Sequence, residues 1–176
     1  MDSKRRISTR VAARIVVLAG DWILLVCDSD PAYPHRRWWV CPGGGVEEGE
    51  TWVQAAVREL YEETGYVLEE KDLGDPVAQR TVVHGYSDRI LIQTERFFFY
   101  QAPYPFEVKP GGLTAQERRN MKGYRWYPLS ELRSLSPQDL WPYDLVGYLE
   151  RRIDDPDSLK GMEIWDLREE STLALI

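Results

Sequence analysis

Residues Gly44 to Tyr66 read GGVEEGETWVQAAVRELYEETGY, a glycine-rich turn that runs directly into a glutamate-rich segment. Within this stretch Thr51 is followed three residues later by Gln54, the spacing of a capping box, in which each side chain bonds the other residue's exposed backbone N–H. A helix is therefore expected to begin directly after Thr51. It is expected to end near Thr64, because Gly65 occupies the place of a left-handed C-terminal cap.

One face of the expected helix is suited to a protein core. Its residues recur at steps of three and four: Val53, Ala56, Val57, Leu60 and Thr64. The neighbouring face carries Glu59, Glu62 and Glu63, because residues three and four apart stack along a helix. Like charges at this spacing weaken a helix by about 0.2–0.5 kcal/mol per pair. Arg58 can pair with Glu62, but one guanidinium group does not neutralise three carboxylates.

Crowded carboxylates of this kind are the ligands that Mg²⁺ and Mn²⁺ prefer in proteins. The alternative is a solvated acidic face, which is the usual place of acidic residues on a helix. The preceding sequence Pro42-Gly43-Gly44-Gly45 favours the metal, because successive glycines let the backbone turn sharply and approach a ligand closely. The sequence therefore predicts an Mg²⁺ site, with Mn²⁺ as the other possibility, where the turn meets the helix.

These residues resemble the signature of the Nudix hydrolases, the MutT-like family, which is G-x5-E-x7-R-E-U-x-E-E-x-G-U with U a bulky apolar residue. All fixed positions are met in register: Gly44, Glu50, Arg58, Glu59, Leu60, Glu62, Glu63 and Gly65. Tyr66 replaces the usual aliphatic residue at the last position, which affects packing and leaves the chemistry in place. The signature does not identify the substrate.

The resemblance implies an α/β fold, the Nudix αβα sandwich with a mixed β-sheet, in a single domain over residues 1–176. It also implies a hydrolase of phosphorus-containing acid anhydrides that cleaves a pyrophosphate bond in a nucleoside diphosphate linked to another moiety. In this chemistry water attacks phosphorus while divalent metals neutralise the phosphates. We therefore expect a small nucleotide-type substrate.

The resemblance also implies roles for the signature residues. The metal ligands would be three glutamates and one carbonyl group: Glu59, Glu62, Glu63 and Gly44. Glu50 and Arg58 would brace the turn against the helix, with a simple ion pair as the alternative. The catalytic residues would include a carboxylate from outside the signature, for which Glu95, Glu107 and Glu117 are candidates. Glu117 is preferred, because its segment leads to the sequence RWYPLSEL, although it could equally be one charge in a solvated run.

Two other functions use the same fold. Nudix-like domains that sense nucleotides without cleaving them typically lack signature carboxylates, all of which are present here. An isopentenyl-diphosphate-type isomerase uses a cysteine and a glutamate outside the signature, and only Cys41 favours it. The sequence shows neither the downstream proline that accompanies ADP-ribose hydrolases nor the marker tyrosine of dinucleoside polyphosphate hydrolases, so the substrate subclass stays open.

Composition sets further limits. A chain of 176 residues forms one core of ordinary size, and its net charge of −7 argues against binding nucleic acid through the phosphates. Cys27 and Cys41 have no disulfide or zinc spacing and are expected to be buried thiols. The chain shows no signal peptide and no membrane-spanning run, so a cytoplasmic location is expected.

The remaining chain is expected to form strands around this helix. The expected strands are 11–19 and 22–27, joined by a hairpin turn at 20–21, and then 38–40, 66–68, 76–83, 89–101 and 124–127. A final helix is expected over 137–153. Residues 1–10 are expected to be flexible, and 154–176 to form a C-terminal extension that docks as a strand or crosses a dimer partner.

Two surface predictions follow from aromatic residues. Arg36 and Arg37 lie beside Trp39, and this grouping is expected to hold a phosphate and stack a base of the substrate. The alternative is solvated arginines beside a core tryptophan. The aromatic run Phe97–Tyr100 and the apolar residues of the extension exceed the evident needs of one small core, which predicts a homodimer.

Overall fold

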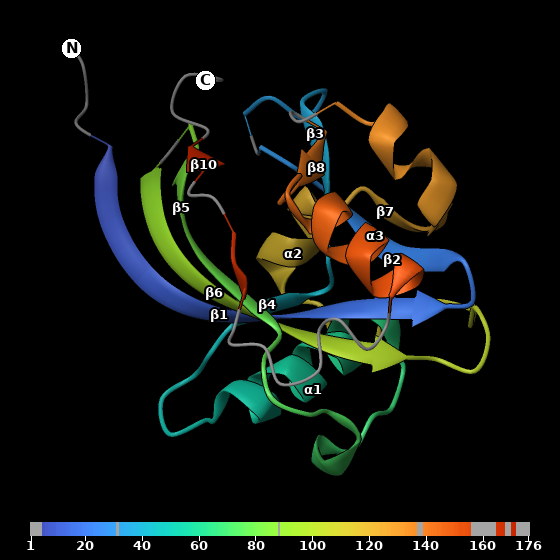
Figure 1. Ribbon diagram of the computed structural model, residues 1–176. Helices are drawn as coiled ribbons and strands as arrows, with labels where there is room; N and C mark the ends of the chain where they lie inside the picture. The colour runs from blue at the N-terminus through green and yellow to red at the C-terminus, as the bar shows by residue number, and fades with distance from the viewer. Residues whose placement is uncertain are drawn as a thin grey trace.

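The computed structural model describes residues 5–30, 32–87, 89–136, 139–155, 165–167 and 170–171. Its long central strands are β1 (Arg6–Ala19) and β6 (Arg89–Gln101). The other strands are β2 (Trp22–Ser29), β3 (Arg37–Val40), β4 (Gly43–Gly45), β5 (Ala78–Gly85), β7 (Gly123–Pro128), β8 (Leu140–Trp141), β9 (Trp165–Asp166) and β10 (Glu170–Ser171). They form one curved sheet in the order β10-β5-β6-β1-β2-β3-β8, while β4 pairs with β1, β7 with β2 and β9 with β5 (Figure 1).

The sheet is mixed. Strands β1 and β6 run parallel in continuous register, from the pair Arg6–Arg89 to the pair Leu18–Gln101. The hairpin of β1 with β2 and the pairing of β5 with β6 are antiparallel. The predicted hairpin turn at 20–21 is therefore confirmed.

Helices cover both faces of this sheet. They are α1 (Trp52–Thr64), the short α2 (Ala115–Asn120) and α3 (Leu145–Asp154), with 3₁₀ turns at Glu70–Asp72 and Leu129–Ser134. Figure 1 shows α1 below the central strands and α3 above them. Alternate residues of β1 point to opposite faces, so that Ile15 packs in the cluster under α1 and Val16 in the cluster under α3. The predicted αβα sandwich is confirmed.

Helix α1 has the ends that its sequence predicts. The Thr51 side chain accepts from the backbone N–H of Gln54, and the Gln54 side chain accepts from that of Thr51. Gly65 ends the helix at φ 74°, and an added Cβ there would lie 2.1 Å from the Lys109 carbonyl oxygen. Only glycine fits this left-handed and closely packed position.

The final helix is shorter than predicted, since it begins at Leu145. Leu140 and Trp141 instead form β8, which pairs in parallel with Trp39 and Val40 of β3. Pro142 has no N–H to donate, so a helix that started near residue 137 would lose a hydrogen bond in its second turn. Residues 137–138 lie outside the described part.

The predicted strand at 66–68 is wrong. These residues have no regular secondary structure: Tyr66 and Leu68 pack inward, whereas Val67 is exposed, and none of the three pairs with a strand. Tyr66 stacks on Phe106 with 4.1 Å between ring centroids, and its hydroxyl lies 2.9 Å from that of Tyr100. The predicted flexible start is also wrong for Arg6 to Arg10, which belong to β1 and pair with β6.

The C-terminal extension docks as a strand in its described residues, since β9 and β10 both pair in parallel with β5. Within the aromatic run, Phe97 and Phe98 are buried in the cores of this single chain. The predicted homodimer therefore stays a prediction and loses this part of its support.

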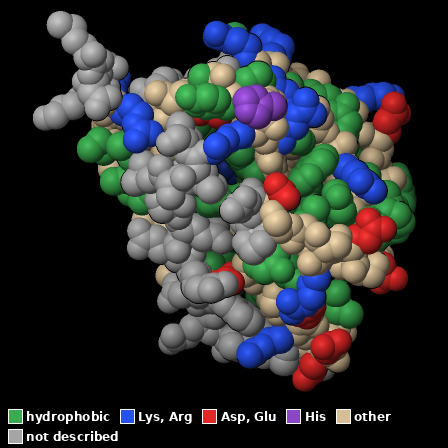
Figure 2. Space-filling view, turned by 90° about the horizontal axis from the view of Figure 1, so that it is seen from above, with side chains coloured by type: hydrophobic (Ala, Val, Ile, Leu, Met, Phe, Trp, Pro, Cys, Tyr) green, Lys and Arg blue, Asp and Glu red, His purple; other side chains and the backbone are tan. Residues whose placement is uncertain are grey.

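The surface carries mixed charge. On the face that Figure 2 shows, basic and acidic side chains of the described residues are interspersed instead of forming one continuous basic surface. No helix within the described ranges is long and apolar enough to cross a membrane. The cytoplasmic location stays a prediction.

Candidate active site

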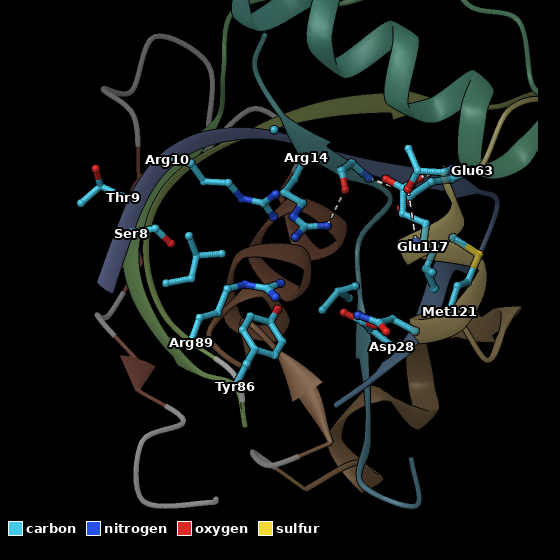
Figure 3. A pocket seen from close by; sticks show the side chains of 18 residues that line it. Ser8, Thr9, Arg10, Arg14, Asp28, Glu63, Tyr86, Arg89, Glu117 and Met121 are labelled. Carbon is cyan, nitrogen blue, oxygen red and sulfur yellow. Dashed lines mark hydrogen bonds between the residues drawn. The ribbon is translucent and has the colours of Figure 1, made fainter. Parts of the chain in front are cut away.

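A cavity of about 550 Å³ opens where β1 and β4 meet the end of α1 and the short helix α2. Figure 3 shows Glu63 and Glu117 on one side of this cavity and Arg10, Arg14 and Arg89 on the other. Carboxylates suit a hard cation, and guanidinium groups suit a phosphate. The cavity can therefore accommodate a metal ion and an anion side by side.

The glycine turn seats two carboxylates of α1. Its residues form β4, which pairs with β1. The Gly43 N–H donates to Glu63 Oε2 over 2.7 Å, and Gly43 has φ 138°. A Cβ on Gly44 would lie 2.5 Å from the Glu59 carboxylate. Glycine at both positions therefore allows the turn and the helix to approach this closely.

Arg58 ties the loop to the helix. It donates to both carboxylate oxygens of Glu50 and to the Gly45 carbonyl, each over 2.9 Å. Its Nη1 group also donates to Glu59 Oε1 over 2.9 Å and to Glu62 Oε2 over 3.2 Å. Arg58 thus connects Glu50 and the Gly45 carbonyl to the carboxylates of α1, and a bracing role for Glu50 and Arg58 stays a prediction.

Glu63 and Glu59 are buried carboxylates that lack full counter-charge. Burial raises the pKa of Glu63 to about 8, although the charge of Arg14 and the Gly43 N–H oppose the shift. Burial also raises the pKa of Glu59, against the hydrogen bond from Arg58. Among the described residues, Glu59 Oε2 is a buried side-chain atom without a hydrogen-bond partner. A cation at this position would satisfy that oxygen and favour the charged form of both groups.

In this structure the carboxylates are not arranged as a complete set of ligands for a cation. Within the described residues, no three acidic, histidine or cysteine side chains gather as a metal-binding group. Arg58 binds one oxygen of Glu59 and one of Glu62, and Gly43 binds one of Glu63. The donor set suits a divalent cation, and binding would require these side chains to converge.

A buried ionic network lies beneath the turn. Glu95 pairs with Arg14 over 2.9 Å and with Arg80 over 2.5 Å. Arg14 also donates to the Gly43 carbonyl over 2.7 Å and to the Cys41 carbonyl over 3.2 Å. Burial would raise the pKa of Glu95, but the charges of Arg80 and Arg14 outweigh it and hold the pKa below its ordinary value. Glu95 is thus an ionised anchor of the turn.

This arrangement agrees with a comparison against known protein families. The family described as "NUDIX domain" matches residues 8–147, which includes every signature residue. The chain belongs to the NUDIX family. The hydrolase class expected from the sequence, acting on phosphorus-containing acid anhydrides, is confirmed by the family and its relatives.

Named relatives of this Nudix chain include RNA pyrophosphohydrolases. Those of Brucella anthropi and Brucella ovis are each 30% identical over 135 residues, which is 70% of this chain and 70% and 68% of theirs. A MutT protein from Methanosarcina mazei Go1 superposes with a TM-score of 0.59 at 19% identity, covering 87% of this chain and 97% of its own. A bifunctional NMN adenylyltransferase/ADP ribose pyrophosphatase from Francisella tularensis, complexed with AMP and a Mn ion, gives 0.51 at 26% identity, covering 84% of this chain and 42% of its own.

The structure separates the three candidate carboxylates of this Nudix chain outside the signature. Glu117 lines the cavity, and its charge contributes to the raised pKa values of Glu59 and Glu63. Its Oε2 also accepts from the Thr114 N–H over 2.7 Å, which caps α2. Glu107 is exposed and pairs with Lys109 away from the cavity lining. Of the three, only Glu117 lines the cavity.

The structure places Arg36, Arg37 and Trp39 outside the residues that line the cavity. Arg36 lies over the ring of Tyr33, and Trp39 packs against the core under α3. Their contact with substrate stays a prediction that this position does not favour. Sequence reasoning missed the arginines of the cavity itself: Arg10, Arg14 and Arg89. A signal was present in β1, where Arg14 interrupts a buried apolar run.

Cys27 and Cys41 are both free and buried, as predicted. Cys41 is 1% exposed, and burial raises the pKa of its thiol to about 12. A thiol in this state can neither reach a substrate nor ionise near neutral pH. The isomerase alternative thereby loses the one residue that favoured it.

Proposed function

We propose that this Nudix chain hydrolyses a pyrophosphate bond in a nucleotide-type substrate with the help of Mg²⁺ or Mn²⁺. The observation that supports it best is Glu59 Oε2, a buried carboxylate oxygen without a partner among the described residues, beside the protonatable Glu63. Glu59, Glu62, Glu63 and the Gly44 carbonyl would hold the metal. When bound, the metal would neutralise phosphate charge and lower the pKa of a water molecule.

The side chains around that position would orient the reaction. Arg58 would hold Glu59 and Glu62 together on one face of α1, since it already binds one oxygen of each. Glu117 would accept a proton from the attacking water, because it lines the cavity while Glu95 is engaged by two arginines. A single positioned base of this kind contributes about 10²–10⁴-fold to a rate.

Two substrate classes deserve comparison. A small nucleotide fits a cavity of about 550 Å³. The 5′ end of an RNA is a second candidate, because the Brucella relatives are RNA pyrophosphohydrolases at 30% identity. The net charge of −7, together with the interspersed charges on the face that Figure 2 shows, favours recognition of the phosphorylated end over binding along an RNA strand.

The test is release of phosphate or pyrophosphate from a panel of substrates, measured with Mg²⁺, with Mn²⁺ and in excess EDTA. The panel holds nucleoside triphosphates, a nucleoside diphosphate sugar, a dinucleoside polyphosphate and a 5′-triphosphorylated RNA. Glu62→Gln and Glu63→Gln are each expected to lower the rate by orders of magnitude without unfolding the chain. Glu48→Gln, an exposed carboxylate of the same loop, is the matched control.

Three results would count against the proposal. Full turnover in EDTA would exclude the metal, and wild-type rates in either glutamine variant would exclude that ligand. Tight nucleotide binding without any turnover would instead support the nucleotide-sensing alternative.

A further inference from the structure

The side of the cavity away from Glu63 carries groups that the hydrolytic site does not use. Arg10, Arg89 and Tyr86 line it, from β1, from the start of β6 and from the turn between β5 and β6. In Figure 3 the Arg89 guanidinium lies beside the Tyr86 ring, and the Arg10 side chain extends toward Arg14. The distance from Arg89 Cζ to the centroid of the Tyr86 ring is 4.6 Å. Arg10, Arg89 and Tyr86 therefore place three hydrogen-bond donors on the same side of the cavity, which we call the wall.

Two of the three groups on this wall are the guanidinium groups of Arg10 and Arg89. Arg10 donates through Nε to the Gln93 amide oxygen, and no described carboxylate forms an ion pair with it. Burial raises the pKa of Tyr86 to about 12, and the charges of Arg10, Arg14 and Arg89 act on the same hydroxyl in the opposite direction. The hydroxyl thus stays protonated and able to donate near neutral pH. Asp28 also lines the cavity and acts on the Tyr86 hydroxyl, and burial raises the pKa of Asp28.

The wall also connects to the glycine turn. A Cβ placed on Gly45 would lie 3.6 Å from Arg10 Nη1, so the Arg10 side chain passes directly over β4. Gly45 follows Gly44, whose Cβ position lies against the Glu59 carboxylate of α1. A phosphate chain that started at the proposed metal position could therefore pass Arg10 and end at Arg89 and Tyr86.

We propose that Arg10, Arg89 and the Tyr86 hydroxyl form an anion subsite for phosphate groups beyond the bond that is cleaved. The subsite rests on the proposed function for its place in catalysis, while its affinity for a phosphate chain is a separate property. It favours substrates with three or more phosphates in series over nucleoside diphosphate sugars. A free nucleoside triphosphate and a 5′-triphosphorylated RNA end supply the same group.

The first test is binding of inorganic triphosphate in EDTA, measured by calorimetry, because it needs neither metal nor turnover. Arg10→Gln and Arg89→Gln are each expected to weaken binding about tenfold, or about 1.4 kcal/mol, because each removes a charged hydrogen-bond donor to the phosphates. Arg89→Lys keeps the charge and should restore part of the loss. Arg125→Gln is the control, because Arg125 is exposed on β7 outside the cavity lining. Equal binding by wild type and both cavity variants, with thermal unfolding unchanged, would overturn the proposal.

The second test is kinetic. With a nucleoside triphosphate, Arg89→Gln is expected to raise KM about tenfold with little change in kcat, because it removes binding shared by ground and transition states. With a nucleoside diphosphate sugar, KM should not change. Equal effects on both substrates would contradict a subsite for additional phosphates.

The two tests also separate the subsite from the proposed function. Weakened triphosphate binding in a chain that hydrolyses nothing on the panel would refute the function and keep the subsite. Metal-dependent hydrolysis by the wild type, together with unaltered triphosphate binding in the arginine variants, would support the function and refute the subsite. Comparing the free nucleotide with the triphosphorylated RNA shows which source gains more from Arg10 and Arg89.

Discussion

Arg14 and Glu95 form a buried ion pair, with 2.9 Å between Arg14 Nε and Glu95 Oε1. The same arginine donates to the carbonyl of Gly43, and the N–H of Gly43 donates to Glu63. The ion pair thereby connects the sheet to the carboxylate face of α1. The position of a proposed metal ligand depends on charged groups in the strands as well as on the helix that carries it.

Glu95→Gln is expected to destabilise the fold, because Arg14 and Arg80 would lose the carboxylate that they share. Loss of one partner from a buried ion pair costs about 3–5 kcal/mol. The pKa of Glu95 lies below its ordinary value, so its stabilisation is present at neutral pH and is lost as pH falls toward the folded-state pKa. Urea unfolding at neutral and at acid pH measures both effects.

The matched control is Glu69→Gln, whose exposed ion pair with Lys71 should contribute within about 0.5 kcal/mol. Similar losses in both variants, or a difference that does not shrink in acid, would contradict the role of Glu95 as an ionised anchor.

Gly44→Ala is expected to impair metal binding more than folding. The added Cβ would lie 2.5 Å from the Glu59 carboxylate, which must move away from the turn. Gly74→Ala is the control, because a Cβ there meets no atom within 4 Å. Calorimetry with Mn²⁺ should show weaker binding in the first variant only. Unchanged Mn²⁺ affinity in Gly44→Ala would remove Glu59 from the proposed site.

The raised pKa of Glu63 predicts that the stability of the metal-free protein depends on pH. Its folded-state pKa of about 8 lies above the unfolded value, so the folded chain binds the proton more tightly. The contribution of Glu63 to stability is therefore greatest below the unfolded pKa and declines as pH rises toward about 8. Glu63→Gln cannot ionise, and it should gain stability relative to wild type over the same interval in EDTA. A constant difference between the two proteins from pH 5 to pH 8.5 would be the contrary result.

The sequence predicted the parts of the fold that depend on local signals. The capping box at Thr51 and the left-handed cap at Gly65 are short-range features, and both ends of α1 were predicted from them. The final helix was placed too early, because Leu140 and Trp141 suit a helical stripe as well as a strand, and only β3 decides between them. The start of β1 was missed for a similar reason, since Arg6 to Arg10 are mostly polar and become a strand through pairing with β6.

The candidate site likewise combines residues that local spacing predicts with residues that only the fold brings together. The carboxylates of α1 follow from spacing along one helix, whereas the cavity wall combines Arg10 of β1 with Tyr86 and Arg89 from about 80 residues later. These residues come together because β1 and β6 pair in parallel register, and no local sequence pattern predicts that register. Arginines next to tryptophan at 36–39 were a plausible local signal, but the fold places them outside the cavity lining.

Glu117→Gln tests the carboxylate outside the signature. A glutamine oxygen can still accept the Thr114 N–H, so the cap of α2 and the stability of the chain should be kept. If Glu117 is the general base, kcat should fall about a hundredfold at saturating metal while the Mn²⁺ affinity stays constant. If it is a metal ligand, the Mn²⁺ affinity should fall as well. Glu107→Gln, an exposed partner of Lys109, should change neither quantity. Wild-type kcat and Mn²⁺ affinity in Glu117→Gln would leave the chemistry to Glu59, Glu62 and Glu63 alone.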